Sequence, residues 1–111
     1  MVGLSVRPGF DFSWAQDVSD GSIVVGFNGI FNSLAGDEAF HWDATHGMRS
    51  LRDVLVNDFS LGASLAGWTM TRAEGISADG RFIVGNGRNP NGDPEAWIAR
   101  LAVKAPSLDP S

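Results

Sequence analysis

Hydrophobic and polar residues alternate near the start of the chain in the pattern of a half-buried β-strand. Phe10, Phe12 and Trp14 occupy every second position, with polar residues between them. Successive side chains of a strand point to opposite faces, so this period of two predicts one apolar face and one polar face. Residues 23–25 and 82–84 are instead continuous runs of β-branched or aromatic residues, which predicts strands buried on both faces.

An Asp-Gly pair precedes each of these runs. Asp20 and Gly21 precede the first run, and Asp79 and Gly80 precede the second. Aspartate can bond its own backbone, and glycine takes a positive φ without a Cβ clash, so both pairs predict tight hairpin turns with a positive φ at the glycine. Two carboxylates can also serve acid–base catalysis, but their place in turns favours a structural role.

The same pattern of residues occurs twice. Three segments return in order further along the chain: residues 9–19 as 67–77, residues 20–26 as 79–85, and residues 38–40 as 95–97. One residue, Ala78, is inserted in the second copy. Matches in order and at nearly constant spacing indicate an internal duplication. We therefore expect an all-β fold in which each copy is an antiparallel meander of three strands, resembling a propeller blade.

These matches set the expected boundaries of the domain. We expect one domain at 1–103 with repeats at 9–47 and 67–102, a connector at 48–66, and a flexible tail at 104–111 that contains two prolines. Within the connector, residues 48–51 predict a short fourth strand. Apolar residues in 51–59 then recur at helical spacing, so one short helix is expected between the copies.

Apolar residues on the inner faces of these strands form the expected core. They are Phe10, Phe12, Val18, Ile23, Val25, Phe40, Trp68, Met70, Ile76, Phe82, Val84 and Trp97. Large aromatic side chains supply the area that a small β-domain must bury.

Composition narrows the classes of function. With 111 residues, of which 43% are hydrophobic, the chain is long enough for one globular core, and its 14 glycines suit many tight turns. The net charge of −5 argues against nucleic acid and against an anionic membrane surface. The sequence has no cysteine, which removes disulfides and thiolate chemistry. No segment approaches the roughly 18 apolar residues of a membrane span, so no membrane insertion is expected.

Aromatic and basic residues that differ between the two copies are the weak candidates for ligand binding. Trp14 stands where the second copy has Arg72, and Trp42 stands where it has Ala99. We take Trp14, Trp42, His41 and Arg72 as these candidates. Packing in the core is the favoured alternative for both tryptophans.

Metal and cofactor signals are weak. His41 and His46 do not have the spacing of a known metal-ligand pair, and no cofactor motif occurs. Residues 89–95 place oxygen-bearing side chains at alternate positions, as calcium loops do, but without the glycine and glutamate positions of an EF-hand. We expect no cofactor and no catalytic or metal site, and leave a weak calcium site in this loop open.

The order of the motifs resembles the HAF-repeat family. The motifs are Val-Ser-Asp-Gly at 18–21, Val-Val-Gly at 24–26, Glu-Ala-Phe-His-Trp at 38–42, Gly-Met at 47–48 and, in the second copy, Glu-Ala-Trp-Ile-Ala at 95–99. HAF repeats are bacterial extracellular repeats named for a His-Ala-Phe tripeptide, and Glu38 and Glu95 stand where its histidine would. The resemblance implies propeller-like four-stranded blades, an extracellular or cell-surface location, and no established catalytic residues. Residues 1–8 lack the features of a signal peptide.

Two classes of function follow from these observations. The first is a non-catalytic binding, surface-display or structural module whose partner is a protein or a carbohydrate, with recognition by loops 27–37 and 86–94. The second is a small β-scaffold hydrolase or lyase without a recognisable motif. An enzyme should gather polar, copy-specific residues at one rim, whereas here the polar residues repeat at turns, which favours the first class.

Two repeats are too few to close a propeller of about four to eight blades. The alternatives are a longer array, a compact two-sheet monomer, or a ring of identical chains. Residues 2–6 are a candidate closing strand beside residues 95–103.

Overall fold

A computed structural model describes residues 3–31 and 33–101 of the chain. Within these ranges the elements are β1 Phe12–Val18, β2 Val24–Ile30, β3 Ser33–Asp43, β4 Gly47–Ser50, α1 Leu51–Phe59, β5 Thr69–Ile76, β6 Phe82–Arg88 and β7 Pro94–Arg100. The short fourth strand and the helix lie where their spacing predicted them. The predicted tail at 104–111 lies outside the described residues.

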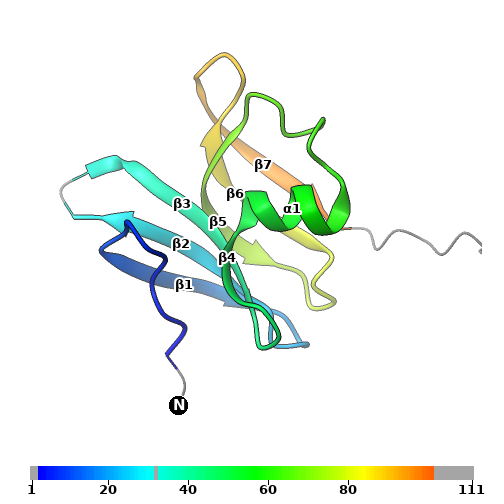
Figure 1. Ribbon diagram of the computed structural model, residues 1–111. Helices are drawn as coiled ribbons and strands as arrows, with labels where there is room; N and C mark the ends of the chain where they lie inside the picture. Colours follow the sequence, from blue (N-terminus) through cyan, green and yellow to red (C-terminus); the bar gives the residue numbers. More distant parts are fainter. Residues whose placement is uncertain (1–2, 32, 102–111) are drawn as a thin grey trace, which may run out of the picture.

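The strands form two antiparallel sheets (Figure 1). The first sheet has the order β1-β2-β3-β4, and the second has the order β5-β6-β7. The prediction of a mainly antiparallel β-fold with one short helix is therefore confirmed. Each sheet is a meander, because every strand pairs with the strand that precedes it in the sequence.

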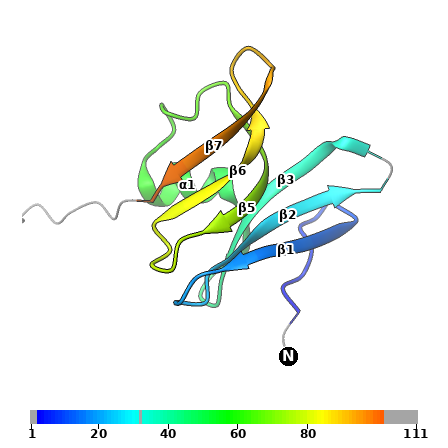
Figure 2. The ribbon, with the colours of Figure 1, turned by 180° about the vertical axis from the view of Figure 1, so that it is seen from behind.

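The two sheets converge at one end and diverge at the other, as Figures 1 and 2 both show. At the converging end the β1–β2 and β5–β6 hairpins meet, and the backbone N–H of Asp20 donates to the carbonyl of Ala78 at 2.9 Å. A carboxylate oxygen of Asp17 accepts the N–H of Ile76 at 2.9 Å. We call this the closed end, and the opposite end, where the β2–β3 and β6–β7 turns lie apart, the open end.

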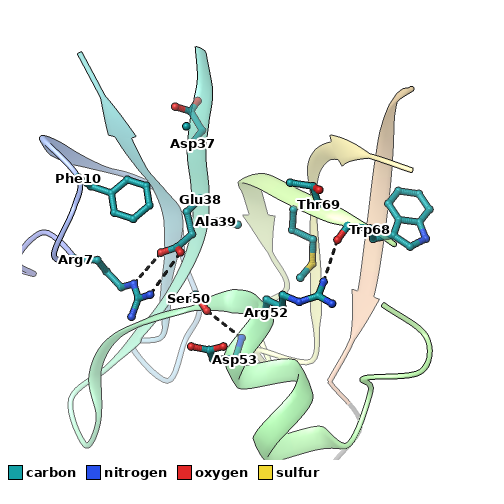
Figure 3. A pocket seen from close by; sticks show the side chains of 12 residues that line it. Arg7, Phe10, Asp37, Glu38, Ala39, Ser50, Arg52, Asp53, Trp68 and Thr69 are labelled. Atoms are coloured by element: carbon teal, nitrogen blue, oxygen red, sulfur yellow. Dashed lines mark hydrogen bonds and ion pairs between the residues drawn. The ribbon is translucent and has the colours of Figure 1, made fainter. Parts of the chain in front are cut away.

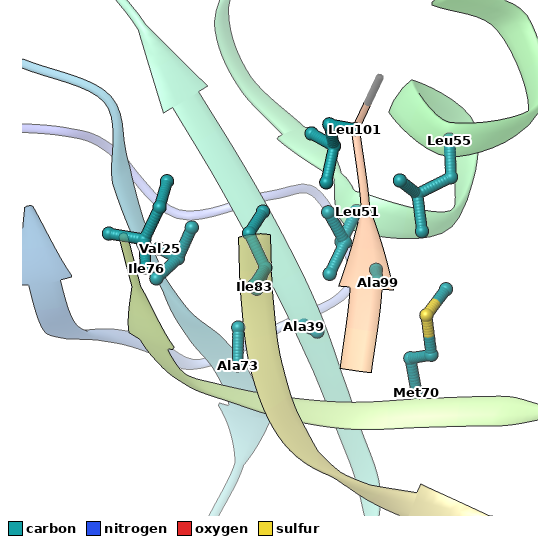
Figure 4. Close-up of a cluster of buried hydrophobic side chains, with 10 residues drawn as sticks. All are labelled: Val25, Ala39, Leu51, Leu55, Met70, Ala73, Ile76, Ile83, Ala99 and Leu101. Atoms are coloured by element: carbon teal, nitrogen blue, oxygen red, sulfur yellow. The ribbon is translucent and has the colours of Figure 1, made fainter. Parts of the chain in front are cut away.

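The core lies between the two sheets and α1 (Figure 4). Its buried members come from both sheets and from the helix: Val25, Ala39, Leu51, Leu55, Met70, Ala73, Ile76, Ile83, Ala99 and Leu101. The helix begins after Ser50, whose hydroxyl accepts the N–H of Asp53 at 3.0 Å. This N-cap satisfies one of the free donors in the first turn and so fixes where the helix starts.

The predicted core is correct in part. Val25, Phe40, Met70 and Ile76 are buried, and Phe10, Phe12, Ile23, Trp68 and Trp97 are half-buried. The prediction was wrong for Val18, Phe82 and Val84, which are exposed.

For Phe82 and Val84, the reason is that β6 is buried on one face only. Along β6, Ile83 is buried and Phe82 and Val84 point away from the core. Strand β2 is buried on both faces, as predicted, because β5 packs on one face and residues 3–10 run along the other. Arg7 anchors that segment by pairing with Glu38 at 2.8 Å, and its backbone N–H bonds Asn28.

The hairpin turns correct a second prediction. Gly80 has the predicted positive φ of 76°, whereas in the first hairpin Ser22, and not Gly21, has a positive φ of 65°. In each turn, the residue with the positive φ is the one whose backbone N–H donates to the carbonyl of the first serine of the turn. That residue is Ser22 in the first turn and Gly80 in the second. The inserted Ala78 accounts for the difference, because it moves the glycine one place along the turn.

The segment 27–37, predicted as a recognition loop, is mostly strand. Strand β2 continues to Ile30 and β3 starts at Ser33. Gly29 permits this extension, because a Cβ at Gly29 would overlap the ring of Phe12, which lies against β2. In the second sheet the loop predicted at 86–94 shortens to the turn between β6 and β7.

Residues 2–6 were proposed to pair beside 95–103. Of this segment, residues 3–6 lie instead beside Trp42 and Met48. A closing strand from the same chain at that position is therefore wrong.

Candidate binding surface

A hollow of about 270 Å³ lies on the first sheet where β5 crosses it, and we call it the aromatic hollow. It is lined by Phe12, Trp14, Gln16, Phe27 and Arg72. Trp14 is 60% exposed, although its ring lies nearly parallel to that of Phe27, with an interplanar angle of 9° and centroids 6.2 Å apart. The strand pairing places the two rings together, because Trp14 is directly opposite Phe27.

Arg72 reaches this hollow from the second sheet. The central carbon of its guanidinium lies 4.2 Å from the centroid of the Phe27 ring, within the range of a cation–π contact. Its Nε donates to Asp37 at 2.7 Å, and the Asp37 side chain is nearly buried. Arg72 is therefore fixed on both sides, and its position in turn holds Phe27 beneath Trp14.

Further aromatic and polar groups border the hollow. Phe31 is 66% exposed and lies 5.4 Å from Phe12 between ring centroids. The side-chain amide of Gln16 donates to Glu74 at 2.9 Å. The surface therefore combines exposed aromatic faces with hydrogen-bonding groups held by other residues, and an exposed apolar group of this kind is typical of an interaction site.

A larger cleft of about 550 Å³ opens between β3, α1 and the start of β5 (Figure 3). Phe10 and Trp68 lie on opposite sides of it. The two arginines in this cleft already have partners within the protein. Arg7 pairs with Glu38 at 2.8 Å, and Arg52 donates to the carbonyl of Trp68 at 2.9 Å. These bonds indicate a mainly structural role, because they join β3 and α1 to the neighbouring loops.

The structure brings two of the four sequence candidates together and separates the other two. Trp14 and Arg72 meet at the aromatic hollow. His41 is buried on β3, and burial lowers the pKa of its imidazole. Trp42 is half-buried beside residues 3–8. His41 and Trp42 therefore do not form part of an exposed binding surface with Trp14.

The carboxyl groups with shifted pKa values all shift downward. Hydrogen bonds from Ile76 and Val18 lower the pKa of Asp17, and the Ser77 hydroxyl and the Arg81 N–H lower that of Asp79. Burial opposes the shift at Asp43, but His46 and Arg49 bring its pKa below the usual value. A carboxyl that donates a proton near neutral pH needs a raised pKa, so none of these three is suited to that role.

The loop considered for calcium is closed by one residue. The side-chain oxygen of Asn89 accepts the N–H groups of Asn91 at 2.9 Å and of Asp93 at 3.0 Å, and its amide donates to Glu95 at 2.9 Å. Within residues 3–31 and 33–101, no three His, Asp or Glu side chains gather in an arrangement that would hold a metal.

Phe27, Phe31 and Asp37 are the site residues that the sequence analysis did not name individually. All three lie in the segment 27–37, which was expected to carry recognition as a loop and is mostly strand. The useful signal was the exchange of Trp14 for Arg72 between matched positions, since both side chains lie at the hollow.

Comparisons with protein-family models, with curated proteins and with solved structures gave no match. No helix in the described ranges has the length and apolar character needed to cross a bilayer.

Proposed function

We propose that the two sheets are two units of one HAF-type repeat. Equivalent strand pairings support this proposal: Gly26 is opposite Phe40 in the first sheet, and Gly85 is opposite Trp97 in the second. A Cβ at either glycine would overlap a backbone carbonyl oxygen, of Trp14 in one sheet and of the residue matched to it in the other. The same close approach at matched positions favours a common unit.

We further propose that the sheets are successive, propeller-like blades. The face of the first sheet that carries Val25 packs toward the second sheet, and Val25 is fully buried. The matched face of the second sheet carries Val84, which is 44% exposed. Equivalent faces therefore point in the same direction along the stack, as they do in successive blades.

The function that this surface supports best is non-catalytic binding of a carbohydrate at the aromatic hollow, in an extracellular or surface-displayed module. The observation that carries this proposal is Trp14, whose indole is exposed but fixed against Phe27. A pyranose ring has a face of C–H groups, and aromatic rings attract such groups through their electron-rich faces. Gln16 and Arg72 also line the hollow and supply hydrogen-bonding groups for the hydroxyls of a bound sugar.

Binding is favoured over hydrolysis or lyase chemistry by the electrostatics of the carboxyl groups. Glycoside hydrolysis uses a pair of carboxyl groups, one of them with a raised pKa. The shifted groups Asp17, Asp43 and Asp79 all have lowered pKa values. None of them lines the aromatic hollow.

The test is a titration of the 15N-labelled protein with a panel of soluble α- and β-linked hexasaccharides, followed through the indole N–H resonances. We expect the Trp14 resonance to shift with at least one saccharide. Trp14→Ala should weaken that binding by about tenfold or more, because an exposed stacking aromatic carries much of the affinity of such a surface.

Val18→Ala is the matched control, because Val18 is also an exposed apolar residue on β1 but lies outside the hollow. It should leave saccharide affinity unchanged. No shift of the Trp14 resonance with any saccharide in the panel would contradict the proposal, and a shift that survives Trp14→Ala elsewhere in the spectrum would place binding at another surface.

A further inference from the structure

Among residues 3–31 and 33–101, the hydrogen bonds of strand β7 run along one side of the strand only. The N–H of Leu101 donates to the carbonyl of Arg81, the residue before β6, at 2.6 Å. In an antiparallel pair, alternate residues point toward the partner strand, so the backbone groups of Ala96, Ile98 and Arg100 point away from β6. In the described part of the chain no residue hydrogen-bonds to these outward groups. They form an open strand edge.

A groove of about 470 Å³ follows this edge. Its lining includes every residue of Glu95–Arg100. Because side chains alternate between the faces of a strand, a groove lined by an unbroken run of residues lies along the edge of that strand. The remaining lining is mainly apolar and includes Leu55, Leu61 and Leu65, from α1 and the segment after it, which pass beside β7 in Figure 1.

Trp97, one of the residues that line this groove, also carries an indole N–H without a partner among the described residues. The nitrogen is buried, and no acceptor for it occurs among the described residues. A buried donor without an acceptor is unfavourable, so an acceptor placed in the groove would be stabilised there. The open backbone edge is the main observation, and the unpaired indole on the same strand is a second unmet hydrogen-bonding group beside it.

The first sheet shows how such an edge is covered. Strand β3 is matched to β7, and its outer edge pairs with β4 in antiparallel register, with Ser50 opposite Phe40. This comparison rests on the repeat correspondence proposed above, whereas the open edge and the indole do not. By analogy, the occupant of the β7 edge is an extended antiparallel strand of about four to six residues.

We propose that the edge of β7 binds an extended segment of a partner protein, which adds to the second sheet as its fourth strand. Backbone N–H and C=O groups satisfy the edge, and apolar side chains opposite Trp97 and Ala99 enter the groove. An antiparallel segment begins beside Arg100 and ends beside Glu95. Charge complementarity therefore selects a segment with an acidic residue first and a basic residue last.

The probe is the acetylated and amidated peptide Asp-Leu-Thr-Val-Thr-Lys, in which the leucine faces Ala99 and the valine faces Trp97. Amide hydrogen exchange of the full chain is measured by NMR with and without the peptide. We expect new protection at Ala96, Ile98 and Arg100. Trp97 and Ala99 should change little, because their N–H groups already bond β6.

The matched control is the charge-reversed peptide Lys-Leu-Thr-Val-Thr-Asp, which has the same composition. It should bind about fivefold or more weakly, because both terminal attractions become repulsions. Trp97→Phe keeps an aromatic ring, although a smaller one, and removes the N–H, so it should weaken binding of the first peptide by about threefold to tenfold. Val18→Ala should not change the affinity, because Val18 lies on β1 and does not line the groove.

Equal binding of the two peptides, or binding without alternating protection along β7, would overturn the proposal. Protection that appears without peptide as the protein concentration rises would also overturn it, since a second copy would then be the occupant. Saccharide titrations of the same samples report on the aromatic hollow, which lies on β1 and β2. Failure of one site is therefore distinguishable from failure of the other.

Discussion

Single residues in the hairpin turns show how one backbone angle decides the cost of a substitution. Gly80 has a φ of 76°, in the left-handed region that residues with a Cβ adopt only with strain. We predict that Gly80→Ala lowers the free energy of unfolding by about 1–2 kcal/mol. Chemical denaturation of the purified protein measures this loss.

Gly21→Ala is the control for this prediction. Gly21 does not have a positive φ, and a Cβ there would have its nearest neighbour at 4.0 Å. This variant should remain within about 0.5 kcal/mol of the parent. Equal losses for the two variants would mean that the two turns do not differ as described.

His41 makes the stability of the protein depend on pH. Burial lowers the pKa of His41 from the ordinary value of 6.5, with smaller opposing effects from Asp43 and Asp58 and a lowering effect from Arg49. Because the folded-state pKa lies below the unfolded value, protonation favours the unfolded chain. We therefore predict that stability is complete above pH 6.5 and falls as the pH drops below it.

Denaturation curves at several pH values between about pH 7 and pH 5 check this prediction. The slope of stability against pH should decrease in His41→Asn. It should persist in the control His46→Asn, because His46 is exposed and does not share the buried environment of His41. A slope that disappears only in His46→Asn would contradict the prediction, because the pH dependence would then arise from His46.

At the scale of the elements, the cost of removing an aromatic side chain depends on whether its strand face is covered. Phe40 on β3 is fully buried, whereas Phe82 at the start of β6 is exposed. We predict that Phe40→Ala costs about 3–5 kcal/mol, the usual loss for deleting a buried aromatic ring. Phe82→Ala should cost less than about 1 kcal/mol. Thermal and chemical unfolding of both variants distinguish these values.

The elements themselves were largely predictable from the sequence. The alternation at Phe12 and Trp14, the β-branched runs and the helical spacing in 51–59 are local signals, and local signals fix the type of an element. Burial was less predictable. Val25 and Val84 occupy matched positions with the same side chain, yet only Val25 has a sheet packed over it. Which face is covered depends on tertiary packing, and that is not written in the period of a strand.

The aromatic hollow was predictable to a similar, limited extent. Trp14 and Arg72 were identifiable because they differ between matched positions. Phe27 lay in the predicted recognition segment 27–37 but was not singled out, because the glycines around it suggested a loop. Those glycines instead allow close approach of neighbouring groups, as at Gly26 and Gly29.

At the scale of the whole molecule, Asp17 links the two sheets at the closed end. Its carboxylate accepts the N–H of Ile76, and this bond is the main cause that lowers the pKa of Asp17 below its ordinary value of 3.8. Because the pKa of Asp17 is lower in the folded state, its stabilising contribution is complete above the unfolded-state pKa. That contribution is lost as the pH falls through the folded-state pKa. We predict that Asp17→Asn lowers stability at neutral pH and reduces the loss of stability in acid.

Acid titration of the two proteins, followed by circular dichroism, checks this prediction. Asp20→Asn is the control. Asp20 lies on the same hairpin, and its side chain has no hydrogen bond to another described residue. If the acid transition of Asp17→Asn coincides with that of the parent, Asp17 does not contribute to the acid sensitivity of the protein.

The convergence of the sheets also has a mechanical meaning. Backbone and carboxylate bonds hold the hairpins together at Asp20 and Asp17, while the β2–β3 and β6–β7 turns stand apart at the far end. Such a pair of sheets has the geometry of a hinge, with its axis at the closed end. A small rotation about that axis would produce a larger displacement of the turns at the open end. The ion pair of Arg72 with Asp37 joins β5 to β3 between the closed and open ends, where it would oppose such a separation of the sheets.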